Sequence, residues 1–146
     1  MEDELRGVVE LGSVRAPMAS RALVVVVDDD LSVRESLPEL LQQCGFAATA
    51  FASADDFLAS STMDQTSCLI LDIVMPGMSG IELARELARR GQAIPIVFIS
   101  GDGDERDRLR LLLQEGAVEC LFKPFGETEL LDAVRVALGA KPNRVP

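Results

Sequence analysis

The sequence predicts an α/β fold: a doubly wound, five-stranded parallel sheet with helices on both faces. Short apolar stretches alternate with helix-like patterns from Ala22 onward, which is typical of crossover connections between parallel strands. The stretches are apolar throughout, which indicates strands that are covered on both sides. The helical segments are apolar on one face only, as Leu37, Leu40 and Leu41 show in the first of them.

The elements can be placed in chain order from their composition and their ends. Apolar residues, many of them β-branched, predict strands at residues 22–27, 47–51, 68–71, 96–99 and 119–122. One-sided apolar periodicity predicts helices at residues 33–44, 54–59, 81–90, 105–115 and 127–138. Four of these helices are followed by a glycine, which ends a helix at little cost in the left-handed conformation: Gly45, Gly91, Gly116 and Gly139.

The first two helices have recognisable starts, and the first has an interruption. Ser32 and Ser53 each precede an acidic residue by three positions, Glu35 and Asp56, which is the pattern of a capping box. Pro38 falls inside the first helix, where it removes a hydrogen bond and costs ~3 kcal/mol or kinks the helix. The sequence offers no account of how the helix tolerates it.

The composition indicates a compact folded protein and excludes several functions. Of the 146 residues 48% are apolar, too many for a disordered chain. Acidic residues outnumber basic ones by 24 to 14, without the clustered cations that bind nucleic acid directly. No apolar run approaches the roughly 18 residues of a membrane helix, and the acidic start does not resemble a signal peptide. Three cysteines without a paired framework favour a reducing compartment, so we expect a cytoplasmic protein.

A single domain is expected to contain the whole alternating pattern, at residues 22–139. Residues 1–21 stand outside that pattern and are predicted to be a flexible arm or the remnant of an upstream region. Residues 140–146 are predicted to be a short tail, because they contain two prolines and no apolar periodicity.

Chemically distinctive residues stand where four of the predicted strands end. The first strand ends in Asp28 and Asp29, the third in Asp72, the fourth in Ser100 and the fifth in Lys123. The carboxyl ends of parallel strands lie side by side, and open α/β sheets bind ligands just outside those ends. Three carboxylates in one place usually hold a divalent cation, because their repulsion is otherwise uncompensated.

Four motifs in this order and spacing resemble the receiver domain of bacterial response regulators, in the CheY-like superfamily: Val27-Asp28-Asp29-Asp30, residues 71–80, Ile99-Ser100-Gly101 and Lys123-Pro124-Phe125. The resemblance covers about residues 22–138. It implies the flavodoxin-like strand order 2-1-3-4-5 and a cis peptide bond between Lys123 and Pro124. It also implies a signalling domain of a two-component system and not an enzyme, apart from self-phosphorylation and self-dephosphorylation.

The resemblance assigns a role to each acidic residue of the site. Asp72 would receive a phosphoryl group, with its carboxylate as the nucleophile. Asp28, Asp29 and Asp72 would hold Mg²⁺, or Mn²⁺ in its place, together with the backbone carbonyl of Val74. Asp30, the third residue of the acidic run, would only start the turn into the first helix.

Ser100 and Lys123 would contact the phosphoryl oxygens, the hydroxyl through a hydrogen bond and the ammonium as a point charge. The donor would be a partner, a sensor histidine kinase or a histidine phosphotransfer protein, because the chain contains no histidine. Phosphorylation would switch a partner-binding face formed by the last two helices and the strand between them, and could drive formation of a homodimer. The sequence does not identify the downstream target.

Two positions depart from the family pattern. Val74, two residues after the acceptor, is often polar in receivers, and an apolar side chain there cannot orient an attacking water. Cys120, three residues before Lys123, stands where many receivers carry an aromatic ring that moves with the serine or threonine. The coupling of Ser100 to such a ring is therefore in doubt, whereas the acceptance of phosphate is not.

Two other functions stay open at this point. A haloacid-dehalogenase-type phosphatase also places an aspartyl nucleophile at a strand end in an Asp-x-Asp turn, and Asp28-Asp29-Asp30 meets that pattern. In such an enzyme, however, Asp72 would have no role. A pseudo-receiver would keep the fold and signal without phosphate; the complete set of site residues argues against it, and Cys120 argues for it.

Overall fold

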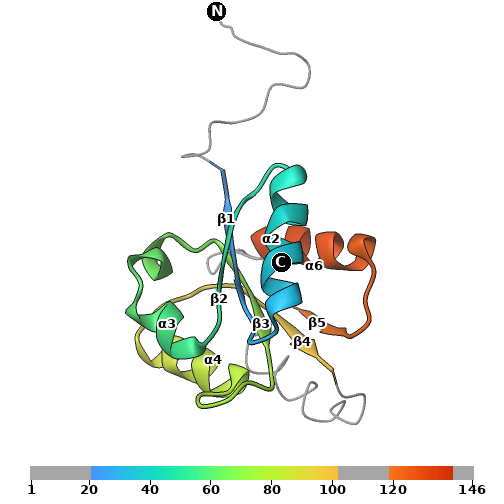
Figure 1. Cartoon of the computed structure of the whole chain (residues 1–146). Helices are drawn as coiled ribbons and strands as arrows, with labels where there is room; N and C mark the ends of the chain where they lie inside the picture. Colours follow the sequence, from blue (N-terminus) through green and yellow to red (C-terminus); the bar gives the residue numbers. More distant parts are fainter. Residues whose placement is uncertain (1–20, 102–118, 140–146) are drawn as a thin grey trace, which may run out of the picture.

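The structure, a computed structural model of the chain, describes residues 21–101 and 119–139 (Figure 1). The helix predicted at residues 105–115, Gly116, the tail and nearly all of the N-terminal arm lie outside the described residues. None of the helices in the described part combines the length and apolarity that crossing a bilayer requires. The extent of the domain, 22–139, stays a prediction.

Five parallel strands form one sheet in the order β2-β1-β3-β4-β5, which confirms the expected topology. The strands are β1 (Leu23–Val27), β2 (Ala47–Phe51), β3 (Cys68–Asp72), β4 (Ile96–Ser100) and β5 (Glu119–Phe122). In the register of the sheet, Val27 pairs with Leu71, Asp72 with Ile99 and Ser100 with Phe122. The carboxyl ends of these strands therefore lie at one edge.

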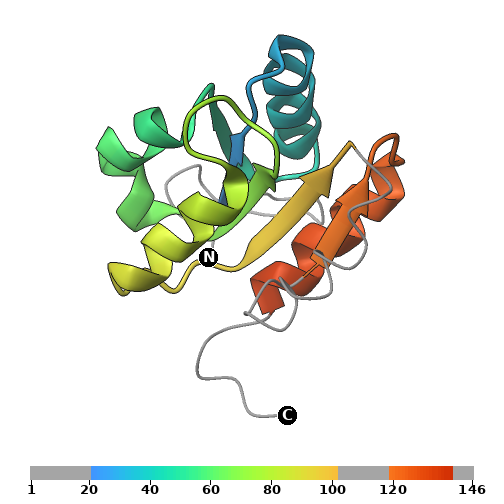
Figure 2. The ribbon, with the colours of Figure 1, turned by 90° about the horizontal axis from the view of Figure 1, so that it is seen from below.

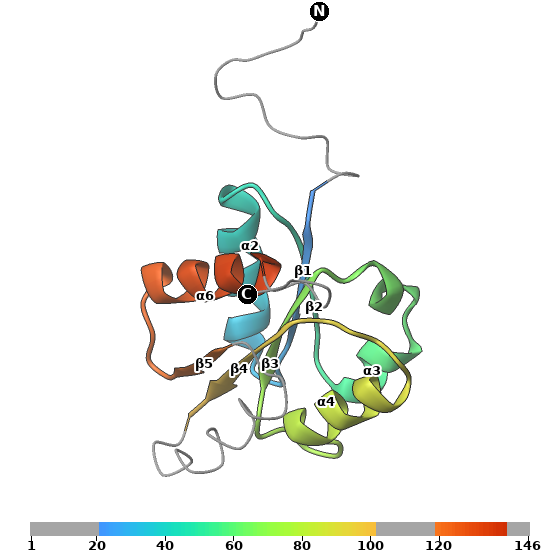
Figure 3. The same cartoon turned by 180° about the vertical axis from the view of Figure 1, so that it is seen from behind.

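The helices form one layer on each face of the sheet. The layers consist of α2 (Leu31–Gln43) and α6 (Glu127–Gly139) on one side, and of α3 (Ala54–Ala59), the short 3-10 helix η2 (Ser61–Gln65) and α4 (Gly80–Arg89) on the other. Figures 1 and 3 show the two layers from opposite sides, and Figure 2 shows the sheet between them. This arrangement confirms the doubly wound fold.

Each layer of helices has its own hydrophobic core, because successive side chains of a strand point to opposite faces. In β1, Val25 and Val27 belong to the core under α3 and α4, whereas Val24 and Val26 belong to the core under α2 and α6. All four of these valines are completely buried. Such burial on both faces explains why the strands read as unbroken apolar runs in the sequence.

The helix starts differ in part from the predicted ones. The N-cap of α2 is Asp30, whose Oδ1 accepts a hydrogen bond from the amide of Ser32 at 2.9 Å. The capping box predicted at Ser32 was therefore wrong, because the carboxylate of Asp30 already caps a helix that starts at Leu31. Ser53 is confirmed as the N-cap of α3. The complete capping box, which the sequence analysis did not identify, belongs to Ser79 at the start of α4.

The structure accommodates the proline and confirms two of the glycine turns. Pro38 lies inside α2 and is buried, so the helix loses one backbone hydrogen bond there but gains the burial of the proline ring. Gly45 and Gly91 have φ values of 98° and 76°, in the left-handed region where only glycine is unstrained. Gly139 is still part of α6, so this helix ends one residue later than predicted.

Replacement of Phe57 by alanine should destabilise the core under α3 and α4. Phe57 is completely buried and contacts Phe51 edge to face, with 5.6 Å between ring centroids. We expect Phe57→Ala to lower the free energy of unfolding by about 3–5 kcal/mol, because the cavity cannot close fully. Urea denaturation followed by circular dichroism measures this loss. Leu31→Ala is the control: its side chain is 59% exposed, and we expect a change within about 0.5 kcal/mol.

Candidate functional site

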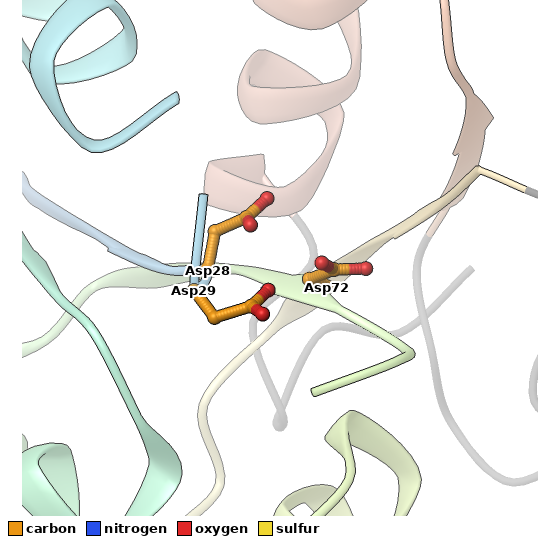
Figure 4. A group of neighbouring side chains, drawn as sticks. All are labelled: Asp28, Asp29 and Asp72. Atoms are coloured by element: carbon orange, nitrogen blue, oxygen red, sulfur yellow. The ribbon is translucent and has the colours of Figure 1, made fainter. Parts of the chain in front are cut away.

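Three carboxylates gather where β1 and β3 end, as Figure 4 shows. Asp28, Asp29 and Asp72 each offer one oxygen atom, and these three oxygens lie within 4.8 Å of one another. Asp28 is completely buried and Asp72 is 6% exposed, whereas Asp29 is exposed to solvent. Two of the carboxylates are thus enclosed by protein while the third leaves the cluster open to ligands.

The turn between β1 and α2 is held by its own side chains. The amide of Asp30 donates to Asp28 Oδ1 at 2.9 Å, and both the amide and the hydroxyl of Ser32 donate to Asp30 Oδ1. The two hydrogen bonds from Ser32 also hold the pKa of Asp30 below its ordinary value. The side chain of Asp30 therefore caps the helix, as expected, and leaves Asp28 and Asp29 to form the cluster.

Arg34 is a supporting residue that the sequence analysis missed. Its Nη1 donates to the backbone carbonyl oxygen of Asp28 at 3.1 Å, across the first turn of α2. The guanidinium therefore fixes the main chain of the acidic turn through a backbone oxygen. A basic residue four positions after the N-cap Asp30 was the available signal, but a helix surface carries such residues for many reasons.

Lys123 brings one positive charge to the cluster. Its Nζ lies 3.4 Å from Asp28 Oδ2 and 3.9 Å from Asp72 Oδ2, and its side chain is 32% exposed. The backbone amide of Lys123 donates to the carbonyl oxygen of Ser100 at 2.8 Å, which joins the ends of β4 and β5. The peptide bond between Lys123 and Pro124 is cis, as the sequence analysis expected. One ammonium against three carboxylates leaves the cluster negatively charged when all are ionised.

This excess of negative charge contributes to a raised pKa of the Asp72 carboxyl. Burial and, after it, the negative charge of Asp28 raise the pKa of the Asp72 carboxyl to about 6, although the ammonium of Lys123 opposes both. The amide of Val74 donates to Asp72 Oδ1 at 3.3 Å, which holds one oxygen of the carboxylate and brings the main chain of Val74 beside it. The hard oxygen donors, crowded and short of positive charge, fit a magnesium ion.

The structure places the remaining predicted residues around this cluster. Ser100 ends β4, is completely buried, and lies one residue beyond Ile99, which pairs with Asp72. Val74 follows β3 with 63% of its surface exposed. All of the residues predicted for the site therefore lie at the same edge of the sheet.

Cys120 occupies a half-buried position on β5. It packs against the core under α3 and α4, on the same side of the strand as Phe122. Burial raises the pKa of its thiol to about 11 and that of Cys68 to about 12. Both thiols thus stay protonated near neutral pH and serve as small apolar side chains.

The chain matches known proteins along most of its length. It matches the response regulator receiver domain over residues 24–135. It is 47% identical to nodulation protein W of Bradyrhizobium diazoefficiens over 119 residues, 82% of this chain and 52% of that protein. It is 40% identical to the transcriptional regulatory protein FixJ of Azorhizobium caulinodans over 116 residues, 80% of this chain and 54% of that protein. The chain spans about half the length of the curated relatives it matches.

Solved structures show the same similarity. The structure of the response regulator StyR has a TM-score of 0.76 and 47% sequence identity, covering 82% of this chain and 60% of that one. The crystal structure of FixJ-N has a TM-score of 0.73 and 35% identity, covering 82% of this chain and 95% of that one. These chains share the sheet order and the helical layers described above.

The raised pKa of Asp72 predicts a specific dependence of stability on pH. An acid whose pKa is higher in the folded state than its usual 3.8 stabilises the fold at low pH, and this contribution is lost as pH rises from about 4 to about 6. We expect the metal-free protein to lose on the order of 1–3 kcal/mol in this interval through Asp72 alone. Asp72→Asn should lack that loss and be more stable than the wild type at pH 7.5.

Urea denaturation in the presence of a chelator, repeated across this pH range, measures the effect. Asp132→Asn is the matched control, because the side chain of Asp132 is 67% exposed on α6 and its removal should leave the pH profile unchanged. Parallel pH profiles for Asp72→Asn and the wild type would contradict the electrostatic account of the cluster.

Proposed function

The chain belongs to the response regulator receiver domain family, and on that premise we propose that it accepts a phosphoryl group on Asp72 in a two-component system or phosphorelay. The observation that supports this proposal is the placement of a nearly buried carboxylate between two further acids and an ammonium. Asp28 and Asp29 lie within 4.8 Å of Asp72 by their oxygens, and Lys123 Nζ lies 3.9 Å away. These groups would provide a nucleophile, a cation site and a positive charge for the phosphoryl oxygens at one edge of the sheet.

The phosphoryl group would come from a partner, because the chain has no histidine of its own. A sensor histidine kinase or histidine phosphotransfer protein would present phosphohistidine at the open side of the cluster. One Asp72 oxygen attacks phosphorus, the P–N bond breaks, and the imidazole nitrogen leaves with the bonding electrons and takes a proton from solvent. The domain itself would catalyse only its own phosphorylation and the later hydrolysis of its acyl phosphate, and we propose that this happens in the cytoplasm.

The acidic residues would hold Mg²⁺, or Mn²⁺ in its place, during this transfer. Asp28, Asp29 and Asp72 supply carboxylate oxygens, and the backbone carbonyl of Val74 would add one more. The bound ion would neutralise charge on the phosphoryl oxygens as the group is transferred. In its absence the same carboxylates repel one another, so the cluster favours the ion-bound state.

Lys123 and Ser100 would recognise the transferred group. The ammonium of Lys123 lies near the carboxylates of Asp28 and Asp72. Because its side chain is flexible, the ammonium could move from the carboxylate to the phosphoryl oxygens after transfer. The Ser100 hydroxyl, at the neighbouring strand end, would donate a hydrogen bond to them. This rearrangement at the ends of β4 and β5 would shift the domain between two states of its partner-binding face, and could lead to a homodimer.

Of the two alternative functions, the phosphatase is excluded by the family and the pseudo-receiver is not. A haloacid-dehalogenase-type phosphatase is set aside, because the chain belongs to the receiver family and Asp30, the second acid of its Asp-x-Asp turn, caps a helix. A pseudo-receiver shares the family, and the thiol of Cys120 at the usual aromatic position is the one observation in its favour. Phosphate incorporation distinguishes it from the proposed function.

Incubation with acetyl phosphate and Mg²⁺ tests the proposal. We expect the intact mass of the wild type to rise by one phosphoryl group, and expect no such rise for Asp72→Asn, which lacks the nucleophilic oxygen. Omission of Mg²⁺ should also prevent the rise. Asp132→Asn, with an exposed acid removed, should behave like the wild type. Incorporation that persists in Asp72→Asn would contradict the assignment, and a wild type that incorporates none would favour the pseudo-receiver.

The exposed Val74 predicts a long-lived acyl phosphate. Its apolar side chain is 63% exposed beside Asp72 and has no group that could orient a water for attack on phosphorus. We expect Val74→Asn to shorten the lifetime of the phosphorylated state several-fold, measured by intact mass after the donor is removed. Val136→Asn, at a valine 54% exposed on α6, is the matched control and should not change the lifetime. Equal lifetimes for all three proteins would exclude this role.

A further inference from the structure

Gly80, the first residue of α4, lies directly against the main chain of the phosphoacceptor. A Cβ atom at this position would lie 2.2 Å from the carbonyl oxygen of Asp72, 3.0 Å from its carbonyl carbon and 3.0 Å from the Cα of Ile73. All three neighbours are backbone atoms, so none can swing aside as a flexible side chain would. The φ of Gly80 is not in the left-handed region, so space alone requires glycine here.

A hydrogen bond strengthens this close approach. The amide of Gly80 donates to the carbonyl oxygen of Ile73 at 2.9 Å, and the amide of Ile73 donates to the carbonyl oxygen of Ile99 on β4 at 3.0 Å. The start of α4 is thereby tied to the last residues of β3 and, through them, to the sheet. Figure 1 shows α4 beginning next to the carboxyl end of β3.

The start of α4 is itself a rigid support. Ser79 Oγ accepts from the amide of Glu82 at 3.2 Å, and Glu82 Oε1 accepts from the amide of Ser79 at 2.8 Å. This reciprocal cap satisfies amides at the helix start that would otherwise lack partners. Beyond it, Ile81 and Leu83, in the first turn of α4, anchor the helix start in the core. The main chain of Asp72 therefore rests on a helix end that is held in place by its cap and by its buried side chains.

The segment closed by these contacts carries the atoms that the site needs. It runs from Asp72 to Gly80 and includes Val74, whose amide holds Asp72 Oδ1. A shift of the Asp72 main chain would move its carboxylate relative to Asp28 and Asp29. Because an octahedral magnesium site tolerates little error in oxygen positions, such a shift would weaken binding of the ion.

We propose that Gly80 is a positioning residue of the phosphoacceptor site, whose missing side chain lets α4 rest on the main chain of Asp72 and so sets where the Asp72 carboxylate and the Val74 carbonyl stand. This inference rests on the proposed function of the same site. To make room for an added methyl group, Gly80 and the Asp72 carbonyl oxygen would have to move apart by roughly 1 Å. A misplacement of that size between reacting groups lowers the reaction rate about 100-fold.

The variant Gly80→Ala tests the inference, with Leu87→Ala as the matched control. Both substitutions are in α4 and both should lower the stability of the fold, but only Gly80→Ala adds an atom against Asp72. Isothermal titration calorimetry measures Mg²⁺ binding, since the chain has no tryptophan or tyrosine for fluorescence. We expect the Mg²⁺ dissociation constant to rise about 10- to 100-fold in Gly80→Ala, with a similar fall in the rate of phosphorylation by acetyl phosphate. Leu87→Ala should keep both wild-type values.

A second pair of variants keeps the test decisive if Gly80→Ala does not fold. Ser79→Ala removes the cap that holds Gly80 in place and adds no atoms, and we expect it to raise the Mg²⁺ dissociation constant several-fold. Ser53→Ala removes the equivalent cap of α3 and should leave Mg²⁺ binding unchanged. If Ser79→Ala binds Mg²⁺ like Ser53→Ala, the inference is overturned.

The outcomes separate this inference from the proposed function. A folded Gly80→Ala that binds Mg²⁺ and accepts phosphate at wild-type levels would show that α4 moves away and that Gly80 serves stability only. A wild type that binds Mg²⁺ but accepts no phosphate would overturn the proposed function and leave the binding test of Gly80 intact. A wild type that binds no Mg²⁺ would overturn both.

Discussion

The repulsion among three carboxylates at one edge of the sheet is the constraint that shapes this molecule. Asp28 and Asp72 are shielded from water, and one oxygen of each lies within 4.8 Å of the other and of an oxygen of Asp29. Lys123 compensates only part of this charge. The raised pKa of Asp72 expresses the imbalance. A fold that keeps such a cluster loses stability in its metal-free state, and a bound cation would relieve the repulsion.

The rest of the structure can be understood as the support that this cluster requires. Two cores, one on each face, bury the central strands β1, β3 and β4 almost completely and prevent the strand ends from separating. Local devices then fix each strand end: Arg34 holds the carbonyl of Asp28, and the start of α4 at Gly80 holds the main chain of Asp72. Each device touches the main chain of an acidic residue of the cluster and not its carboxylate. Both act by limiting how far the acidic residues can move apart.

Site residues with distinctive chemistry at strand ends could be predicted from the sequence. Residues that matter because they contact a particular backbone atom in the folded structure could not. Asp28, Asp72 and Lys123 follow apolar runs, so the parallel sheet alone brings them together. Arg34 and Gly80 carry no such mark, because their importance depends on which backbone atom lies beside them. The cap of α2 was misplaced for a related reason: Ser32 and Asp30 both suit an N-cap, and only the observed hydrogen bond decides between them.

The sequence by itself determined the fold class, since the alternation of apolar strands with one-sided helices calls for a parallel sheet that is covered on both faces. The strand order followed only from the resemblance to receiver domains. The sequence also determined which strand ends carry charge. The tertiary structure alone decided how closely the charges approach, which of them lose contact with water, and how far Asp72 departs from its usual acidity. Those quantities depend on distances between residues that are remote in the chain, such as Asp28 and Lys123, and no local pattern encodes a distance of that kind.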